Sequence, residues 1–305
     1  MRLHINKFAY VDIMLKQQPI TELLARSQPL LSVEFFPPKS PESVDGLVRA
    51  ANRISESKPD FISVTYGAGG STRDLSATVS RRMKDEVGLQ VMPHFTCVGS
   101  TREELGEIVD EFYNEGYRNI MALRGDPTKG HDTFQVTEGG FAYASDLVAF
   151  IKERHPDMCL GIAGYPEKHP EAPSLDTDLN ALKIKADSGG SFITTQLFFD
   201  NEAYFRFVDQ VRDRGIELPI IPGIMPVLSL KQIIRITQLC QSQLPKRLEL
   251  ALRQVEDDPN AVRSIGVEWA QRQIAELIEQ GADGVHIYAL NKVKSAIELI
   301  NAARG

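Results

Sequence analysis

The sequence predicts an α/β fold, a (β/α)8 barrel of the TIM type, from three observations. Eight short apolar runs, each about as long as a buried strand, recur along the 305 residues. Helix-like segments separate these runs, and that alternation favours eight parallel strands closed into a barrel. Isolated polar residues stand near the C-terminal edges of the runs. Because barrel enzymes carry their chemistry where the strands end, these polar residues are the candidate functional groups.

The first of the predicted strands is followed by Pro37 and Pro38, which end it because proline has no backbone N–H for a sheet ladder. The eight runs, in order, are LLSVEFFPP from Leu30, FISVTYG from Phe61, QVMPHFTCV from Gln90, NIMALRGD from Asn119, CLGIAGYP from Cys159, FITTQLFF from Phe192, LPIIPGIMPV from Leu218 and GVHIYAL from Gly284.

Three other segments complete the predicted barrel. Residues 1–28 contain ITELLARS, which predicts a short helical extension that closes the bottom of the barrel. Residues 127–143 are too polar and Gly-rich for a helix and predict a loop on the top face after strand four. Residues 229–282 form an elaborated connection between strands seven and eight. Its helices are predicted to start at Ser229, Pro245 and Pro259.

Composition predicts a single domain, residues 1–305, because 42% hydrophobic content suffices for one large core and no Pro/Gly-rich linker interrupts the chain. The net charge of −7 argues against nucleic acid as a partner. No run is long enough to span a membrane, and no export signal is evident. Cys97, Cys159 and Cys240 lack metal-ligand spacing, so we expect a reducing cytoplasm and no metal site.

Polar residues on one face of several strands indicate a shared site, because side chains two positions apart point the same way. A single buried His or Gln is more often a hydrogen-bonded core residue than a ligand. The occurrence of polar residues on six strands is harder to explain by packing alone. The residues are Glu34, Thr65, His94, the pair Arg124 and Asp126, the pair Thr194 and Gln196, and the pair His286 and Tyr288.

Glu34 has apolar neighbours, Val33, Phe35 and Phe36, whose desolvating effect disfavours a charged carboxylate and suits a general acid. An ion pair with an Arg or Lys is an equally good interpretation at this point. The run from Gly67 to Gly70 can cradle a phosphate, but it lacks the lysine of a P-loop. No HxH or HExxH cluster supports a metal-dependent aldolase.

Together the motifs SVEFFPPKS, SVTYGAGG, PHFTC, ALRGD, GGFAYASDLV, GYPEKHPEA, TTQLFFD, PGIMPV and HIYALNK resemble those of methylenetetrahydrofolate reductase, in the family's order, from about Leu31 to Lys292. The resemblance implies an oxidoreductase with FAD as its cofactor. NADH or NADPH reduces the flavin and leaves, and methylenetetrahydrofolate then binds over the same flavin face. It is reduced to methyltetrahydrofolate, a methyl donor for methionine synthesis.

The resemblance also implies roles for individual residues. Glu34 matches the acid that protonates the folate nitrogen, so that the ring opens to an iminium. Asp126 matches a carboxylate beside flavin and pterin that stabilises this cation. Substrate binding falls to Gln196, Leu230, Tyr288 and Lys292. FAD binding falls to Thr65, Tyr66, Ala68, His94, Arg124, Gly125, Asp126, Tyr143, Ala144, Tyr165, His169, Ala172, Asp178 and Lys185, the last as the partner of a phosphate.

Several positions depart from the family pattern. Leu230 replaces a phenylalanine, which weakens stacking on the substrates. Ala181 and Ile184 replace polar residues that face the cofactor, and Lys292 replaces an arginine and loses its bidentate fork. The chain ends at Gly305, without a regulatory domain, so we expect no inhibition by adenosylmethionine.

Alternatives to the reductase are another FAD barrel of the proline dehydrogenase type and a non-catalytic cofactor-binding subunit. Flavin barrels of this kind commonly self-associate, so we also expect a homo-oligomer. The choice between NADH and NADPH stays open, because no separate dinucleotide fingerprint is present.

Overall fold

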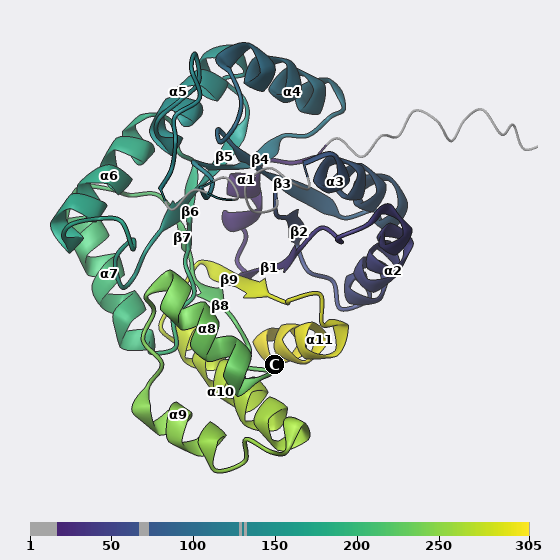
Figure 1. Cartoon of the computed structure of the whole chain (residues 1–305), viewed down its shortest axis with the longest axis vertical. Coiled ribbons are helices and arrows are strands. Elements are labelled where there is room, and N and C mark those ends of the chain that lie inside the picture. Colours follow the sequence, from purple (N-terminus) through teal and green to yellow (C-terminus); the bar gives the residue numbers. More distant parts are fainter. Residues whose placement is uncertain (1–16, 67–72, 128–129, 131–132, 305) are drawn as a thin grey trace, which may run out of the picture.

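The structure is a computed structural model that describes residues 17–66, 73–127, 130 and 133–304. Its strands are all parallel and lie in one sheet, in the order β7-β6-β5-β4-β3-β2-β1-β9-β8. Figure 1 shows the strands at the centre of a ring of helices, which confirms the predicted barrel. The strands are β1 (Leu30–Phe35), β2 (Phe61–Val64), β3 (Gln90–Thr96), β4 (Asn119–Leu123), β5 (Cys159–Gly164), β6 (Phe192–Thr195), β7 (Ile220–Ile221), β8 (Gly223–Ile224) and β9 (Gly284–Tyr288).

The seventh predicted strand is divided, and this corrects the interpretation of LPIIPGIMPV as one strand. Proline lacks a backbone N–H, and Pro222 accordingly separates β7 from β8. β7 pairs with β6, whereas β8 pairs with β9. The carbonyl of Pro222 still accepts a hydrogen bond from the His286 N–H at 2.9 Å. The chain that passes through Pro222 therefore closes the ring.

Helices follow the strands and cover the outside of the barrel (Figure 1). Several begin at side-chain caps, which satisfy otherwise unpaired N–H groups. Thr101 forms a capping box with Glu104, and Ser174 and Asp200 cap α6 and α7. The helices are α1 (Ile20–Leu24), η1 (Pro41–Ser43), α2 (Val44–Ser55), α3 (Arg73–Val87), α4 (Arg102–Asn114), α5 (Ala144–Arg154), α6 (Leu175–Asp187), α7 (Asn201–Asp213), α8 (Leu230–Cys240), α9 (Lys246–Arg253), α10 (Pro259–Glu279) and α11 (Val293–Arg304).

The connection from β8 to β9 contains the three predicted helices. Ser229 caps α8 through its side chain, and Pro245 stands at the N-cap of α9. Asp258 caps α10, whose first residue is Pro259. A proline at that position is favourable because the first helical N–H has no partner within the helix. These helix starts confirm the elaborated connection.

Helix α1 closes the N-terminal end of the barrel, as the sequence predicts. Ile20 and Leu23 are buried in a cluster with the first inward-facing side chains of the strands. The Asn119 side chain on β4 accepts a hydrogen bond from the Ile20 N–H and donates one to the Gln18 carbonyl, both at 2.8 Å. These two bonds dock the start of α1 onto the barrel.

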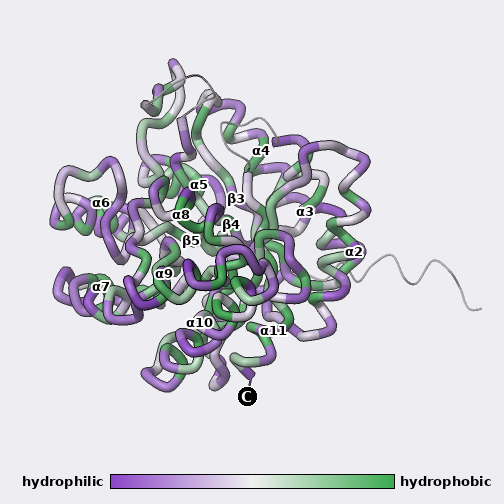
Figure 2. The backbone as a smooth tube through the Cα atoms, turned by 60° about the horizontal axis from the view of Figure 1, so that its bottom comes forward, coloured by the Kyte–Doolittle hydropathy of each residue, from purple (hydrophilic) through white to green (hydrophobic). Residues whose placement is uncertain are grey.

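The main apolar core lies between the strands and the outer helices. Figure 2 shows the hydrophobic stretches gathered inside the molecule and hydrophilic stretches on outer helices such as α7. In the part of the chain that the structure describes, no helix is both long and apolar enough to cross a membrane. The interior of the barrel is a separate region, apolar at its N-terminal end and polar toward its C-terminal end.

Candidate active site

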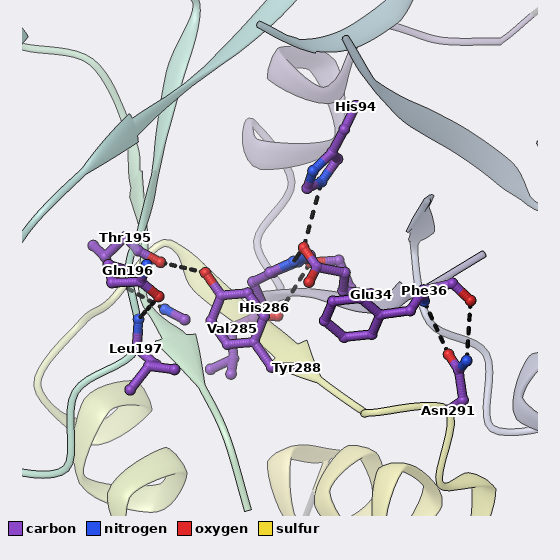
Figure 3. A network of polar contacts seen from close by, with 12 residues as sticks. Glu34, Phe36, His94, Thr195, Gln196, Leu197, Val285, His286, Tyr288 and Asn291 are labelled. Carbon is purple, nitrogen blue, oxygen red and sulfur yellow. Dashed lines mark hydrogen bonds and ion pairs between the residues drawn. The ribbon is translucent and has the colours of Figure 1, made fainter. Parts of the chain in front are cut away.

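Glu34, near the C-terminal end of β1, lies between two imidazoles (Figure 3). Its Oε2 atom is 3.4 Å from Nε2 of His94 on β3 and 3.4 Å from Nε2 of His286 on β9. Glu34 is only 5% exposed. Burial lowers the pKa of His94, because an interior site disfavours the imidazolium ion. Among the described residues, the partners of Glu34 are thus histidines, not the Arg or Lys left open by the sequence.

Ser32 and Phe61 hold His286 from below. The register of β1 and β9 pairs Ser32 with His286, and the serine Oγ lies 2.8 Å from the His286 Nδ1. The His286 ring also stacks on Phe61, with centroids 6.3 Å apart. His286 is 1% exposed. One ring nitrogen therefore faces Ser32 and the other faces Glu34.

Tyr288, two residues after His286, lies next to Glu34 in the strand register. Its hydroxyl donates to the Thr195 carbonyl at 2.7 Å (Figure 3). Burial, and secondarily the charge of Glu34, raise the pKa of Tyr288 well above its ordinary value. A Cβ atom at Gly223 would lie 2.5 Å from the Tyr288 ring, so only glycine leaves room for this tyrosine.

Asn291 fixes the exit of β1. Its side chain accepts a hydrogen bond from the Phe36 N–H at 2.9 Å and donates one to the Phe36 carbonyl at 3.0 Å (Figure 3). Leu290 and Asn291 both have positive φ angles, of 50° and 57°, which are uncommon outside glycine. This turn after β9 therefore ties the backbone two residues beyond Glu34 to the eighth barrel strand.

A second polar group follows β5 and extends onto α6. The rings of Tyr165 and His169 meet edge to face, and the Asp178 carboxylate accepts a hydrogen bond from the His169 N–H at 2.9 Å. Lys185 is half-buried and donates to the Ala163 carbonyl. Burial lowers the pKa of Lys185 to about 8, against the opposing effect of Asp178. The structure brings these four predicted residues together.

Arg124 and Asp126 lie in the loop after β4, which ends at Leu123, and not within the strand. Gly125 between them has a φ of +93°, so the alternation of a strand does not extend across this pair. Arg124 forms a double hydrogen bond, 2.7 Å each, with Glu171. Asp126 is exposed, and its charge contributes to the raised pKa values of Tyr165 and Cys240, for which burial is the larger cause.

The remaining predicted site residues occupy varied positions. Thr65 follows β2, and its Oγ1 is buried without a hydrogen-bond partner in the described chain. Gln196 follows β6, and its side chain accepts a hydrogen bond from the Leu197 N–H. Ala172 accepts a hydrogen bond from the Lys168 side chain through its carbonyl. Tyr66 is buried, Tyr143 and Lys292 are exposed, Ala144 starts α5, and Ala68 lies outside the described residues.

Leu230 starts α8 and lines a cavity of about 460 Å³ between α8, α9 and the start of α10. Glu34 and both of its histidine partners are absent from the lining of this cavity. A cavity of about 360 Å³ beside α3 and α4 does reach His94 and Tyr66. Leu230 also belongs to an apolar cluster against which Tyr288, the neighbour of Glu34 in the strand register, packs.

Sequence reasoning missed several residues in these contacts, among them Ser32, Glu171 and Cys240. Ser32 has a sequence signal, since it lies two positions before Glu34 and so shares its face of β1. Glu171, the partner of Arg124, lies in the GYPEKHPEA motif but comes from a distant segment. Cys240 ends α8 and is electrostatically coupled to Asp126, which no local pattern indicates.

Within the ranges that the structure describes, no group of three His, Cys, Asp or Glu side chains is arranged to hold a metal ion. The polar groups near Glu34 are instead imidazoles and hydroxyls, and the group after β5 adds the half-buried ammonium of Lys185. These groups are suited to hydrogen bonding with an organic ligand.

Comparisons with known proteins identify the family of this chain. The family model for methylenetetrahydrofolate reductase matches residues 19–304. Over 92% of this chain, 36% of residues are identical to methylenetetrahydrofolate reductase (NADH) 1 of Arabidopsis thaliana, and the match spans 49% of that protein. The 5,10-methylenetetrahydrofolate reductase of Salmonella typhimurium is 37% identical over 92% of this chain and 93% of its own. The chain thus spans about half the length of the plant relative.

A solved structure with a similar fold comes from Clostridium thermocellum, an uncharacterized protein that binds two copies of 5-methyl-5,6,7,8-tetrahydrofolic acid. Its TM-score is 0.65 at 20% identity, and the match covers 92% of this chain and 96% of that one. At this identity the likeness supports the barrel fold. The family model and the curated relatives carry the assignment, and by them this chain belongs to the methylenetetrahydrofolate reductase family.

Proposed function

We propose that this chain reduces 5,10-methylenetetrahydrofolate to 5-methyltetrahydrofolate, with FAD as its cofactor and NADH or NADPH as the electron donor. The observation that carries the proposal is the buried carboxyl of Glu34, held between two imidazoles near the C-terminal end of β1. Reduction of the methylene bridge requires a proton at a folate nitrogen, and Glu34 is the group suited to provide it.

Residues that follow β2, β4 and β5, or lie on α6, are suited to hold an FAD molecule. The buried hydroxyl of Thr65, which has no protein partner among the described residues, is available for a ligand. Lys185 presents an ammonium group beside the Tyr165 ring, 5.8 Å from its centroid, where it can pair with a diphosphate. Arg124, His169 and Asp178 lie around the same ring. When bound, FAD supplies the carrier through which reducing equivalents pass from the nicotinamide nucleotide to the folate.

The protein side chains supply the acid, the local charge and the substrate contacts. Glu34 donates its proton to the folate nitrogen, so that the methylene-bridged ring opens to an iminium. Asp126 offers a negative charge that stabilises this cation. Gln196 and Tyr288 bind the pterin side of the folate, and Lys292 attracts its glutamate tail as a point charge. Two substrates use the same site in turn, which gives a ping-pong sequence.

The experiment is a comparison of the two half-reactions in the wild-type protein and in Glu34→Gln. Flavin reduction by the nicotinamide nucleotide is measured first, under anaerobic conditions, and reoxidation by methylenetetrahydrofolate is measured second. We expect Glu34→Gln to slow the second step by about 10²–10⁴-fold, the usual contribution of a general acid, and to leave the first step within about twofold. Equal loss of both steps would remove the acid role from Glu34.

A further inference from the structure

Side chains of the connection between β8 and β9 hold the loop that follows β6. This strand ends at Thr195, and beyond it the chain leaves the sheet. Three successive carbonyls of the loop accept hydrogen bonds from the connection: Leu197 from Ser242 at 2.9 Å, Phe198 from Gln273 at 3.4 Å and Phe199 from Trp269 at 2.9 Å. The Gln273 contact is the weakest of the three because it is the longest. The connection therefore fixes the path of the loop just after Gln196.

The backbone of Gln196 and Leu197 is held from both sides. The Gln196 N–H donates to the Gly164 carbonyl at 2.8 Å, and the Leu197 carbonyl accepts from the Ser242 hydroxyl. Leu197 and Ser242 are buried, at 3% and 8% exposure, so this bond is costly to leave unmade. Gln241, at the C-cap of α8, has a φ of +54° that ends the helix. The turn that follows brings the serine hydroxyl onto the loop.

The Leu197 N–H in turn orients the Gln196 side chain. This N–H donates to Oε1 of Gln196 at 2.9 Å (Figure 3). A backbone N–H can only donate, so the side-chain atom that faces it must be the amide oxygen and not the nitrogen. Among the residues that the structure describes, Nε2 of Gln196 has no hydrogen-bond partner. The two amide N–H groups of Gln196 are therefore left for a ligand.

We propose that Ser242 is a positioning residue for the folate site: by holding Leu197, it keeps the amide N–H groups of Gln196 directed at acceptor atoms of the bound pterin. This inference rests on the proposed function, in which Gln196 binds the pterin side of the folate. Ser242 restricts the backbone to which the glutamine side chain is bonded, so less ordering is needed when the substrate binds. Trp269 supports the same loop through the Phe199 carbonyl.

The kinetic test measures reoxidation of the reduced, FAD-loaded protein over a range of methylenetetrahydrofolate concentrations. This separates the half-saturating concentration, which reports binding, from the limiting rate, which reports the later steps. We expect Ser242→Ala to raise the half-saturating concentration about two- to tenfold, the usual effect of one hydrogen bond. The limiting rate should stay within about twofold, because Ser242 is assigned no part in proton or hydride transfer.

Trp269→Phe is a second variant, which removes the indole N–H but keeps an aromatic ring. It should shift the half-saturating concentration in the same direction by a smaller factor, because the Phe199 carbonyl lies further along the loop from Gln196. This variant tests the proposal even if Ser242→Ala does not fold.

Thr237→Ala is the matched control. Thr237 is buried on α8 at 9% exposure, but its hydroxyl donates to the Ile233 and Ile234 carbonyls of its own helix, both at 3.0 Å. Its loss removes a buried hydroxyl from the same helix without removing a bond to the loop after β6. The half-saturating concentration of folate should therefore stay at the wild-type value.

Two further readouts separate positioning from a general structural effect. In a Gln196→Ala background, Ser242→Ala should raise the half-saturating concentration no further, because the two changes act through one amide group. Hydrogen exchange of the Leu197 N–H, followed by NMR without any ligand, should be faster in Ser242→Ala than in the wild type or in Thr237→Ala.

The outcomes distinguish the two proposals. If methylenetetrahydrofolate does not reoxidise the wild-type protein at any concentration, the proposed function is wrong, and the positioning role is wrong with it. If reoxidation occurs but Ser242→Ala matches Thr237→Ala in half-saturating concentration and in exchange, only the positioning role is wrong. Fully additive effects of Ser242→Ala and Gln196→Ala would also contradict it, since Ser242 would then act on another part of the site.

Discussion

The two ends of the barrel interior are built on the same strands but carry different side chains. At the N-terminal end Phe61, Met92 and Phe192 pack against α1 in an apolar cluster. Toward the C-terminal end, the inward positions carry Glu34 and His286. Side chains two positions apart on one strand point to the same side. One such step along a strand therefore leads from a residue of the apolar cluster to a residue of the polar end. The comparison assigns stability to the lower end of the barrel and reactivity to the upper end.

The largest expected loss of stability is at the lower end. Phe192 is fully buried, and its ring fills the space beside Gly161. Phe192→Ala leaves a cavity and should lower the free energy of unfolding by about 3–5 kcal/mol, as measured by urea denaturation. The half-reaction rates of the folded variant should change little. Leu239→Ala, at a 68% exposed position on α8, is the control and should stay within about 0.5 kcal/mol. A strong effect of Phe192→Ala on the folate step alone would contradict the assignment of stability to one end and reactivity to the other.

Removal of the Asn119 side chain should have a smaller effect. Its two hydrogen bonds hold residues 18–20 at the closed end of the barrel. Asn119→Ala leaves the Ile20 N–H without its buried partner and should cost about 1–3 kcal/mol of unfolding free energy. Hydrogen exchange should show earlier opening of α1 than of the strands. Unchanged protection of α1 would show that its packing alone closes the barrel.

At the upper end, FAD affinity should depend on pH through Lys185. Its pKa is lowered to about 8, so the amine is charged below that pH and neutral above it. A diphosphate favours the charged amine, so binding is strongest below pH 8 and weakens as pH rises. We expect about tenfold weaker FAD binding at pH 9 than at pH 7, followed by fluorescence titration. Lys185→Met should flatten this dependence, whereas Lys183→Met, an ion-paired lysine on the same helix, should keep it.

The smallest effect concerns Leu230, which stands where some family members have phenylalanine. If that position contacts the bound folate, Leu230→Phe adds an aromatic ring and should lower the folate KM about threefold, within the range of one aromatic contact. Leu228→Phe, in the same cavity lining, is the control and should not improve KM. Leu230 shares an apolar cluster with Tyr288. An unchanged KM would mean that Leu230 itself does not reach the substrate.

The sequence predicted the strand starts outside the seventh run and the helices after strand seven, because hydrophobic periodicity and helix caps are local signals. The break at Pro222 was not predicted. An apolar run does not show which of its residues must pair a backbone N–H with a neighbouring strand. Strand alternation predicted that Glu34, His94 and His286 share a site, but not that the two histidines pair with Glu34. His94 and His286 come from strands β3 and β9, and only the closed barrel sets their 3.4 Å distances to Glu34.

Beyond the strand ends the sequence was less informative. Thr65, Arg124 and Gln196 were assigned inward positions by alternation, but each lies just after its strand. Their side-chain directions then depend on loop geometry, such as the positive φ of Gly125. The pairing of Arg124 with Glu171 joins two residues 47 positions apart in two loops. Only the folded chain shows that they meet.

The most direct test of the central claim is absorbance of the FAD-loaded wild-type protein in the flavin band under anaerobic conditions. The protein is mixed with NADH or NADPH and then with methylenetetrahydrofolate. We predict bleaching by one of the nucleotides, which identifies the donor, followed by recovery of the absorbance as the folate is reduced. Failure to bind FAD, or bleaching that methylenetetrahydrofolate does not reverse, would contradict the assignment of the upper end of the barrel to folate reduction.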